Sequence, residues 1–233
     1  MSHQSENFLA FADRFLTTGT CLRTRKAYAE LARSVELAVG TPDVFETSEG
    51  VLVFAAKGAV KLVAHASMAR QQVIAFYFAG DTFIMPANGP HGFSLHALSD
   101  SEMLVFPYAR FTELAHDECE ILRHLLDRNA LSLQRSREKT IALGRKTALE
   151  RVAGFLIAMC ERIGTARGSH IEIALPMSRR DIADSLGLTI ETVSRQFSHL
   201  RKIGVVETHG RSRVTVFSLD ALDGQSGTMR HAA

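Results

Sequence analysis

The chain has 233 residues, 46% of them apolar, and a formal net charge of +2 at neutral pH. This length suits one large or two modest domains, and the apolar content excludes an intrinsically disordered chain. The N-terminus lacks the features of a secretion signal, and the longest uncharged run, Thr82 to Ser99, is interrupted by Pro and Gly. We therefore expect a cytoplasmic protein that does not contact membranes.

The cysteine pattern excludes a disulfide scaffold. Cys21, Cys119 and Cys160 are widely spaced, odd in number and without a C-x-x-C pair. Such spacing also fails to form a self-contained zinc or cluster site. We expect free thiols, and Glu118 and Glu120 beside Cys119 give no support to a thiolate-based redox sensor.

Charge is distributed unevenly along the chain. Residues 1–142 hold 14 Lys and Arg against 16 Asp and Glu, a net charge of −2. Residues 143–219 hold 12 against 7, a net charge of +5. A compact basic segment attracts polyanions such as double-stranded DNA, although a chance imbalance on a solvated surface gives the same pattern.

Short apolar runs separated by turn residues fill the stretch from Glu49 to Pro107. The runs are VLVFAA, AVKLVA, QQVIAFYF, TFIM, FSLHAL and EMLVF, and Lys57-Gly58 and Ala79-Gly80-Asp81 are among the breaks. Strands of this length and spacing are typical of an antiparallel barrel or jelly roll. The N-terminal half is therefore predicted to be an antiparallel β-roll.

A single long helix is predicted from Asp117 to Lys139, because this stretch contains neither Gly nor Pro. Its apolar stripe covers the β region of the same chain or meets the same helix of a second chain in a homodimer. Asn129 on that stripe either sets the register of a dimer or is an exposed polar position. The candidate interface residues are Leu122, Leu125, Leu126, Asn129 and Leu133.

The pattern becomes helical again after Gly144. ALERVAGFLIAMCERI predicts one amphipathic helix, in which Cys160 is a small core residue rather than a ligand. Gly164 to Ser169 is predicted to be a flexible break, and IEIAL a short strand.

The segment SRRDIADSLGLTIETVSRQFSHLRKIGVV contains two predicted helices joined by a tight turn. Ser178 with Asp181 marks the start of the first helix, Gly187 supplies the turn, and Thr189 caps the second helix. Val193, Phe197 and Leu200 form the buried stripe of that second helix. The outward positions are Glu191, Thr192, Ser194, Arg195, Ser198 and His199.

This division is typical of a DNA recognition helix. Arg195 can contact guanine with two hydrogen bonds and Glu191 can accept from cytosine N4, each contributing roughly 1 to 3 kcal/mol of discrimination. We expect Glu191, Ser194 and Arg195 to read bases. The expected phosphate contacts are Ser178, Arg179, Thr189, Thr192, His199 and Arg211.

Two short strands follow in VVETHGRSRVTVFSL, around a tip with His209, Gly210 and Arg211. Helix, turn, helix and basic hairpin together describe a winged helix-turn-helix. The alternative is an ordinary helical hairpin inside a larger core, which would leave the polar exposed face without a purpose.

The whole arrangement resembles the Crp/Fnr superfamily of bacterial transcription regulators over about residues 20–220. The stretch LGLTIETVSR, with its E-x-x-S-R pattern, is similar to the Fnr and FixK branches, as are FAGDTF and LGRKTALERVAGFL. The resemblance implies an α+β fold with a cyclic-nucleotide-binding-like jelly roll at residues 1–112, a dimerisation helix at 113–143 and a winged helix-turn-helix at 144–233. It also implies a palindromic TTGAT-N4-ATCAA-like operator read by Glu191, Ser194 and Arg195.

The chain departs from the family at the residues that bind a cofactor or ligand and so sense a signal. The oxygen-sensing Fnr branch holds an iron-sulfur cluster on four cysteines, whereas this chain has three and Leu104 where the β-roll cysteine is expected. Cyclic AMP is also not expected, because GDTFIMPANGPHGFSLHAL lacks the arginine that would bind its phosphate. Haem remains an alternative, with candidate ligands at His65, His91, His96 and His116, although a single histidine is a weak signal. The remaining reading is FixK-like, in which the amount of protein is controlled and no ligand is needed.

Two classes of function remain to be compared. The first is a homodimeric transcription regulator that binds DNA and recruits RNA polymerase. The second is a β-roll enzyme or small-molecule-binding protein, but the chain contains no G-x-S-x-G, H-E-x-x-H or G-x-x-x-x-G-K motif. We therefore expect a regulator and not an enzyme. The target genes, the direction of regulation and the role of the two ends, which look flexible or loosely docked, stay open.

Overall fold

A computed structural model describes residues 3–16, 19–40, 42–43, 50–67, 70–87, 92–116, 118–210 and 212–227. His91, Asp117 and Arg211, which the sequence analysis singled out, lie outside these residues. The chain divides into two compact units, residues 1–135 and 136–233, and the boundary falls inside the long helix α4 (Cys119–Arg145). None of the helices in the described ranges has the length and hydropathy needed to cross a membrane.

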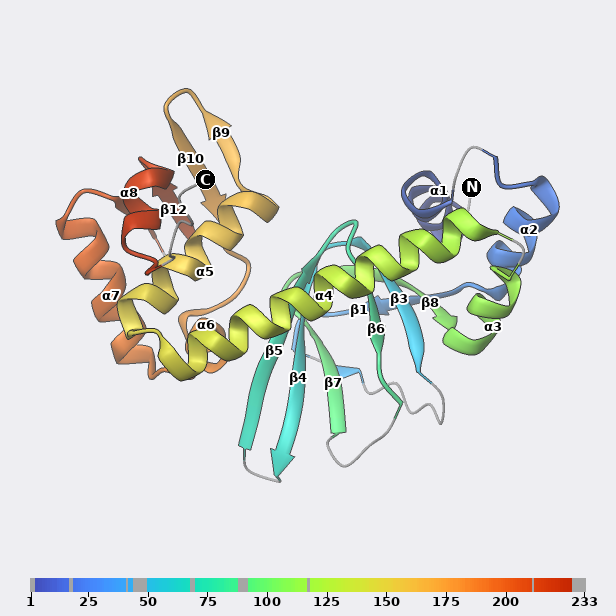
Figure 1. Ribbon diagram of the computed structural model, residues 1–233, viewed down its shortest axis with the longest axis horizontal. Coiled ribbons are helices and arrows are strands. Elements are labelled where there is room, and N and C mark those ends of the chain that lie inside the picture. The colour runs from blue at the N-terminus through green and yellow to red at the C-terminus, as the bar shows by residue number, and fades with distance from the viewer. Residues whose placement is uncertain are drawn as a thin grey trace. The chain divides into compact units, whose positions relative to one another are not determined.

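The described residues of the N-terminal unit form two antiparallel sheets, which confirms the predicted antiparallel β architecture (Figure 1). One sheet has the order β1 (Arg33–Leu37), β8 (Ser101–Pro107), β3 (Val51–Lys57), β6 (Thr82–Met85). The other has the order β2 (Pro42–Asp43), β7 (Gly92–Ala97), β4 (Ala59–Ser67), β5 (Arg70–Phe78). The six predicted strands are confirmed, and β1 and β2 are additional.

Strands β3 and β8 are buried on both faces, which explains why they are almost continuously apolar. Val53 and Val105 point between the two sheets, whereas Phe54 and Leu104 point the other way. There they join an aromatic cluster whose rings include Phe11, Phe15, Tyr28, Phe106 and Phe111. Side chains alternate along a strand, so each of these strands contributes to two cores at once.

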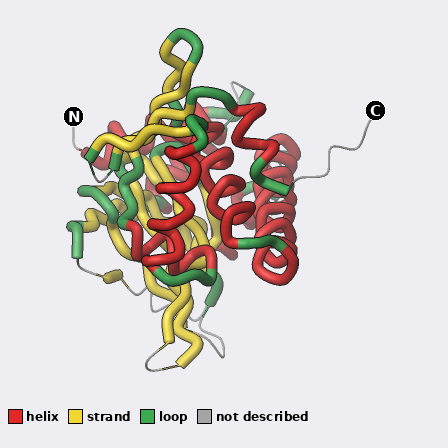
Figure 2. The backbone as a smooth tube through the Cα atoms, turned by 90° about the vertical axis from the view of Figure 1, so that its left-hand side faces the viewer, coloured by secondary structure: helices red, strands yellow, loops and turns green. Residues whose placement is uncertain are grey.

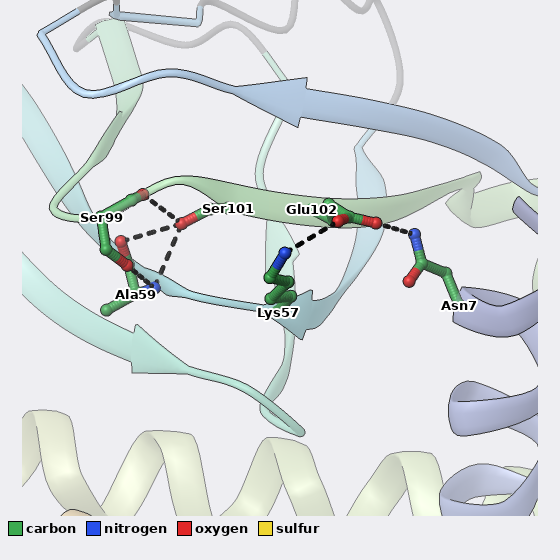
Figure 3. A network of polar contacts seen from close by, with 6 residues as sticks. All are labelled: Asn7, Lys57, Ala59, Ser99, Ser101 and Glu102. Carbon is green, nitrogen blue, oxygen red and sulfur yellow. Dashed lines mark hydrogen bonds and ion pairs between the residues drawn. The ribbon is translucent and has the colours of Figure 1, made fainter. Parts of the chain in front are cut away.

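The N-terminal segment is not a loosely docked end, so that expectation was wrong. Helix α1 (His3–Phe15) packs on β3 and β8, with Phe11 fully buried and its ring 4.8 Å from that of Phe106. Asn7 donates a 2.7 Å hydrogen bond to Glu102, which also pairs with Lys57 (Figure 3). Two further helices, α2 (Leu22–Leu31) and α3 (Tyr108–Leu114), complete this layer.

Helix α4 confirms the predicted long helix but corrects its apolar stripe. Leu125 is only 4% exposed and belongs to the aromatic cluster of its own chain, and Leu122 packs against that cluster. Leu125 is therefore committed to the core of its own chain, whereas a dimer contact of the half-buried Leu122 stays a prediction. Leu126 is 67% exposed, because a step of one residue from Leu125 turns the helix by about 100° away from the core. Leu133 is 52% exposed and lies in a stretch of α4 whose neighbouring residues are exposed as well.

In its described residues, the C-terminal unit combines four complete helices with one antiparallel sheet. The helices are α5 (Ala148–Ile163), α6 (Arg179–Leu186), α7 (Ile190–Lys202) and α8 (Leu219–Gly224). The sheet has the order β11 (Val206–His209), β12 (Arg213–Val216), β10 (His170–Ala174), β9 (Thr165–Arg167).

Two expectations for this unit were wrong. The segment after Gly164 contains β9, which pairs with β10 in a projecting hairpin rather than forming a flexible break (Figure 2). The chain after α8 is also docked as far as it is described, because Lys146 donates a 2.9 Å hydrogen bond to the carbonyl oxygen of the fully buried Ser226. Residues 228–233 lie outside the described ranges.

Candidate nucleic-acid interface

The first helix of the helix-turn-helix begins with a reciprocal cap. The Ser178 hydroxyl accepts from the backbone N–H of Asp181 at 3.2 Å, and the Asp181 carboxylate accepts from the backbone N–H of Ser178 at 2.8 Å. The Ser178 hydroxyl also donates to that carboxylate at 2.6 Å. The cap confirms the predicted start of α6, and both side chains take part in it. The phosphate contact expected of Ser178 stays a prediction.

A left-handed glycine makes the turn between α6 and α7. Gly187 has a φ of 62°, and the backbone N–H of Leu188 bonds to the carbonyl of Ala183 at 3.0 Å. A side chain at Gly187 would be placed 3.1 Å from Leu143 of α4. The positive φ therefore favours glycine here, and an added side chain would also have to displace the end of the Leu143 side chain by a few tenths of an ångström.

The second helix, α7, has the two faces that the sequence predicted. Thr189 caps it by accepting from the backbone N–H of Thr192 at 3.2 Å. Val193, Phe197 and Leu200 are buried. The exposed positions are Glu191, Ser194, Arg195, Ser198 and His199, and Thr192 is half-buried.

The exposed face carries both an acceptor and a forked donor. Hydrogen bonds from its own backbone N–H and from the Thr189 side chain lower the pKa of Glu191, so this carboxylate is charged at neutral pH. Arg195 donates a hydrogen bond to the Thr192 hydroxyl at 3.3 Å. Glu191 and Arg195 can therefore offer complementary groups to base edges in a major groove.

Arg179 packs on the recognition helix. Its guanidinium carbon lies 3.3 Å from the centre of the Phe197 ring, and one terminal nitrogen, Nη1, is buried without a hydrogen-bond partner. Burial lowers the pKa of Arg179 to about 10, which still leaves it charged at neutral pH. No local pattern in the sequence indicates this cation–π contact, and the phosphate contact expected of Arg179 stays a prediction.

The wing is confirmed as two paired strands. His209 at the end of β11 is opposite Arg213 at the start of β12, and Gly210 follows with a φ of 63°. Arg211 at the tip is outside the described residues. The exposed basic side chains of the C-terminal unit include Arg180, Arg195, Arg201, Lys202 and Arg213.

Two of the candidate haem ligands converge on one serine in the N-terminal unit. The hydroxyl of the buried Ser94 lies 2.7 Å from His65 Nε2 and 2.8 Å from His96 Nε2. These are nitrogen atoms that could otherwise coordinate iron. His116 is exposed and does not share this contact. Among the described residues, no group of three or more His, Cys, Asp or Glu is placed to hold a metal ion.

The three cysteines are free thiols in separate environments. Cys160 is buried in α5, as predicted, and burial raises the pKa of its thiol to about 11. Cys21 is exposed and caps α2, where hydrogen bonds from Thr24 lower its pKa. Cys119 is exposed at the first residue of α4.

Comparison with known proteins identifies the family. Residues 150–224 match the Crp-like helix-turn-helix domain. The nitrogen fixation regulation protein FixK of Azorhizobium caulinodans is 35% identical over 206 residues, which cover 83% of each protein. This chain belongs to the Crp/Fnr family. It is a DNA-binding transcription regulator of the FixK-like branch.

Further Crp/Fnr proteins agree with this assignment. FixK of Rhizobium meliloti is 33% identical over 165 residues, covering 71% of this chain and 73% of that protein. The structure of FixK2 from Bradyrhizobium japonicum has a TM-score of 0.75 and 30% identity, covering 85% of this chain and 99% of that one. A mutant of CooA from Carboxydothermus hydrogenoformans, at 18% identity and a TM-score of 0.77, shares the fold. The predicted family, fold and regulator function are confirmed.

The turn between the helices can be tested with two glycine variants. Gly187→Ala should lower the free energy of unfolding of this Crp/Fnr regulator by more than Gly204→Ala. Both glycines have positive φ, which costs a substituted residue about 1 to 2 kcal/mol, but only Gly187 has a neighbour within 4 Å of the added carbon. Urea denaturation measures the difference, and equal losses would contradict the close approach of Leu143.

Proposed function

We propose that this regulator binds a palindromic operator with TTGAT-type half-sites as a homodimer, each chain reading one half-site. The observation that carries the proposal is the division of α7. Its buried stripe holds the helix on the unit, while Glu191, Ser194 and Arg195 share the exposed face. A helix presented in this way fits the major groove with its N-terminal half toward the bases.

The exposed face of α4 supports a dimer. Leu126 and Leu133 are seven residues apart and therefore lie on the same side of the helix, and Asn129 lies between them. We propose that a second copy covers this stripe, because a two-fold dimer matches the symmetry of a palindrome.

Positive charge on the C-terminal unit supports the phosphate contacts. Thr189, Thr192 and His199 flank the base-reading positions on α7, and we propose that they contact the DNA backbone together with Arg211 of the wing. Exposed Arg180, Arg201, Lys202 and Arg213 add sequence-independent attraction. Backbone contacts position the helix, whereas the base contacts select the sequence.

We further propose that binding needs no small ligand and that the bound dimer recruits RNA polymerase through its surface loops. The hydrogen bonds of His65 and His96 to Ser94 support this over a haem sensor, because they occupy the Nε2 atoms of both candidate ligands. In this proposal the protein acts by binding, and the cell controls its activity through its amount.

The proposal is tested by fluorescence anisotropy on a duplex with TTGAT-N4-ATCAA and on a scrambled duplex, in air, without ligand and at one stated salt concentration. We expect at least a thousandfold preference for the palindrome, about the lower end for specific regulators. Equal affinity for both duplexes would refute the base-reading assignment. Selective binding that appears only after addition of haem or reductant would refute ligand independence.

Arg195→Ala should weaken binding to the palindrome by roughly 1 to 3 kcal/mol and relax the preference at one base pair of each half-site. The dimer should persist in sedimentation, because Arg195 is exposed on α7 and belongs to the other unit from Leu126. Titration against a set of single-base variants measures the preference. An unchanged base profile would remove Arg195 from the reading set.

Leu126→Lys combined with Leu133→Lys should convert the dimer to a monomer and abolish tight operator binding, since it places charges on the proposed interface. Leu131→Lys is the matched control, because Leu131 is also exposed but lies on another side of α4. Sedimentation of the purified proteins measures the assembly. A double variant that remains a dimer would exclude this stripe as the interface.

A further inference from the structure

Arg151 makes a set of contacts that the recognition face does not explain. It lies in the first turn of α5, and all three nitrogen positions of its guanidinium donate to backbone carbonyl oxygens. Nε bonds to Lys146 at 2.9 Å, Nη1 to Leu186 at 3.1 Å and Nη2 to Leu143 at 2.8 Å. The Arg151 side chain is part-buried, and each of its three guanidinium nitrogens donates to a main-chain carbonyl oxygen.

The three carbonyls belong to two helix ends that are far apart in the sequence. Leu143 lies in the last turn of α4 and Lys146 directly follows it, whereas Leu186 is the last residue of α6. Carbonyls at the end of a helix lack intrahelical partners and carry partial negative charge. A planar guanidinium with fixed donor directions can join such ends in one geometry, which a flexible ammonium cannot.

A second contact occurs at the same joint. The Leu143 side chain lies beside Gly187, so close that an added carbon would be 3.1 Å from it. The end of α4 therefore meets the turn of the helix-turn-helix through both a polar and an apolar contact. All of these residues belong to the C-terminal unit, so the joint is a feature of that unit alone.

We propose that Arg151 is a positioning residue that sets the direction of the last turns of α4 relative to the helix-turn-helix, and thereby the half-site spacing that the dimer accepts. The inference rests on the proposed dimer on a palindrome. Two recognition helices must enter successive major grooves roughly 34 Å apart, and α4 carries the proposed dimer contact. A change of angle at its end moves each α7 relative to the dyad.

A purely structural role for Arg151 makes a different prediction. Loss of three hydrogen bonds would then lower stability and the fraction of active protein, and the affinity for every operator would fall by the same factor. A positioning role acts on the spacing itself, because one added or removed base pair shifts a half-site by about 3.4 Å and rotates it by about 35°. Discrimination between spacings therefore separates the two roles.

The experiment measures anisotropy of the full-length protein on three duplexes whose TTGAT and ATCAA half-sites are separated by three, four or five base pairs, at one salt concentration. The variants are Arg151→Lys, which keeps the charge, and Arg151→Met. Arg167→Met is the matched control, since it removes one positive charge from the exposed hairpin of the same unit. Sedimentation and thermal unfolding confirm that each variant is dimeric and folded.

We expect the unaltered protein and Arg167→Met to prefer the best spacing by about tenfold or more over the other two. Arg151→Lys should reduce that preference to about two- or threefold while remaining dimeric. A uniform loss on all three duplexes, with the preference retained, would overturn the inference even if Arg151→Met fails to fold. If the unaltered protein binds none of the duplexes selectively, the proposed function itself fails, and the inference fails with it.

Discussion

Helix α4 carries apolar side chains on two faces, and the organisation of the chain depends on which surface each face contacts. Leu125 is buried among the aromatic residues of the β-roll, whereas its neighbour Leu126 is exposed. Because each residue advances the helix by about 100°, adjacent positions serve different surfaces. One face anchors the helix to its own chain, and the other is left free for the proposed second chain.

A similar division between a buried face and an exposed face occurs in α7 of the C-terminal unit. Val193 and Phe197 hold α7 by burial, whereas the polar face of the helix is exposed. Arg151 holds the end of α4 against α6 through backbone carbonyls, which do not depend on side-chain rotamers. The exposed face determines which bases can be contacted, and in our proposal the joint determines where the two faces are placed.

Features that depend on neighbouring residues were predictable. The reciprocal cap of Ser178 and Asp181, the left-handed Gly187 and the buried stripe of α7 each arise within a few residues of chain. The strands of the β-roll that correspond to apolar runs were also predicted, because the turn residues and the lengths of the runs are visible in the local sequence. Family membership could be expected for the same reason, since the recognition stretch is one continuous motif.

Sequence alone determined the succession of β-roll, long helix and winged helix-turn-helix, the faces of α7 and the class of function, because helical and strand periods and caps act over short distances. Tertiary structure alone decided that α1 is part of the core, that Leu125 is buried while Leu126 is exposed, and that Arg179 packs on Phe197. It also decided that Arg151 joins two helix ends separated in sequence. These features depend on which distant segment of the chain packs against a given surface. The local sequence pattern around a residue does not identify that segment.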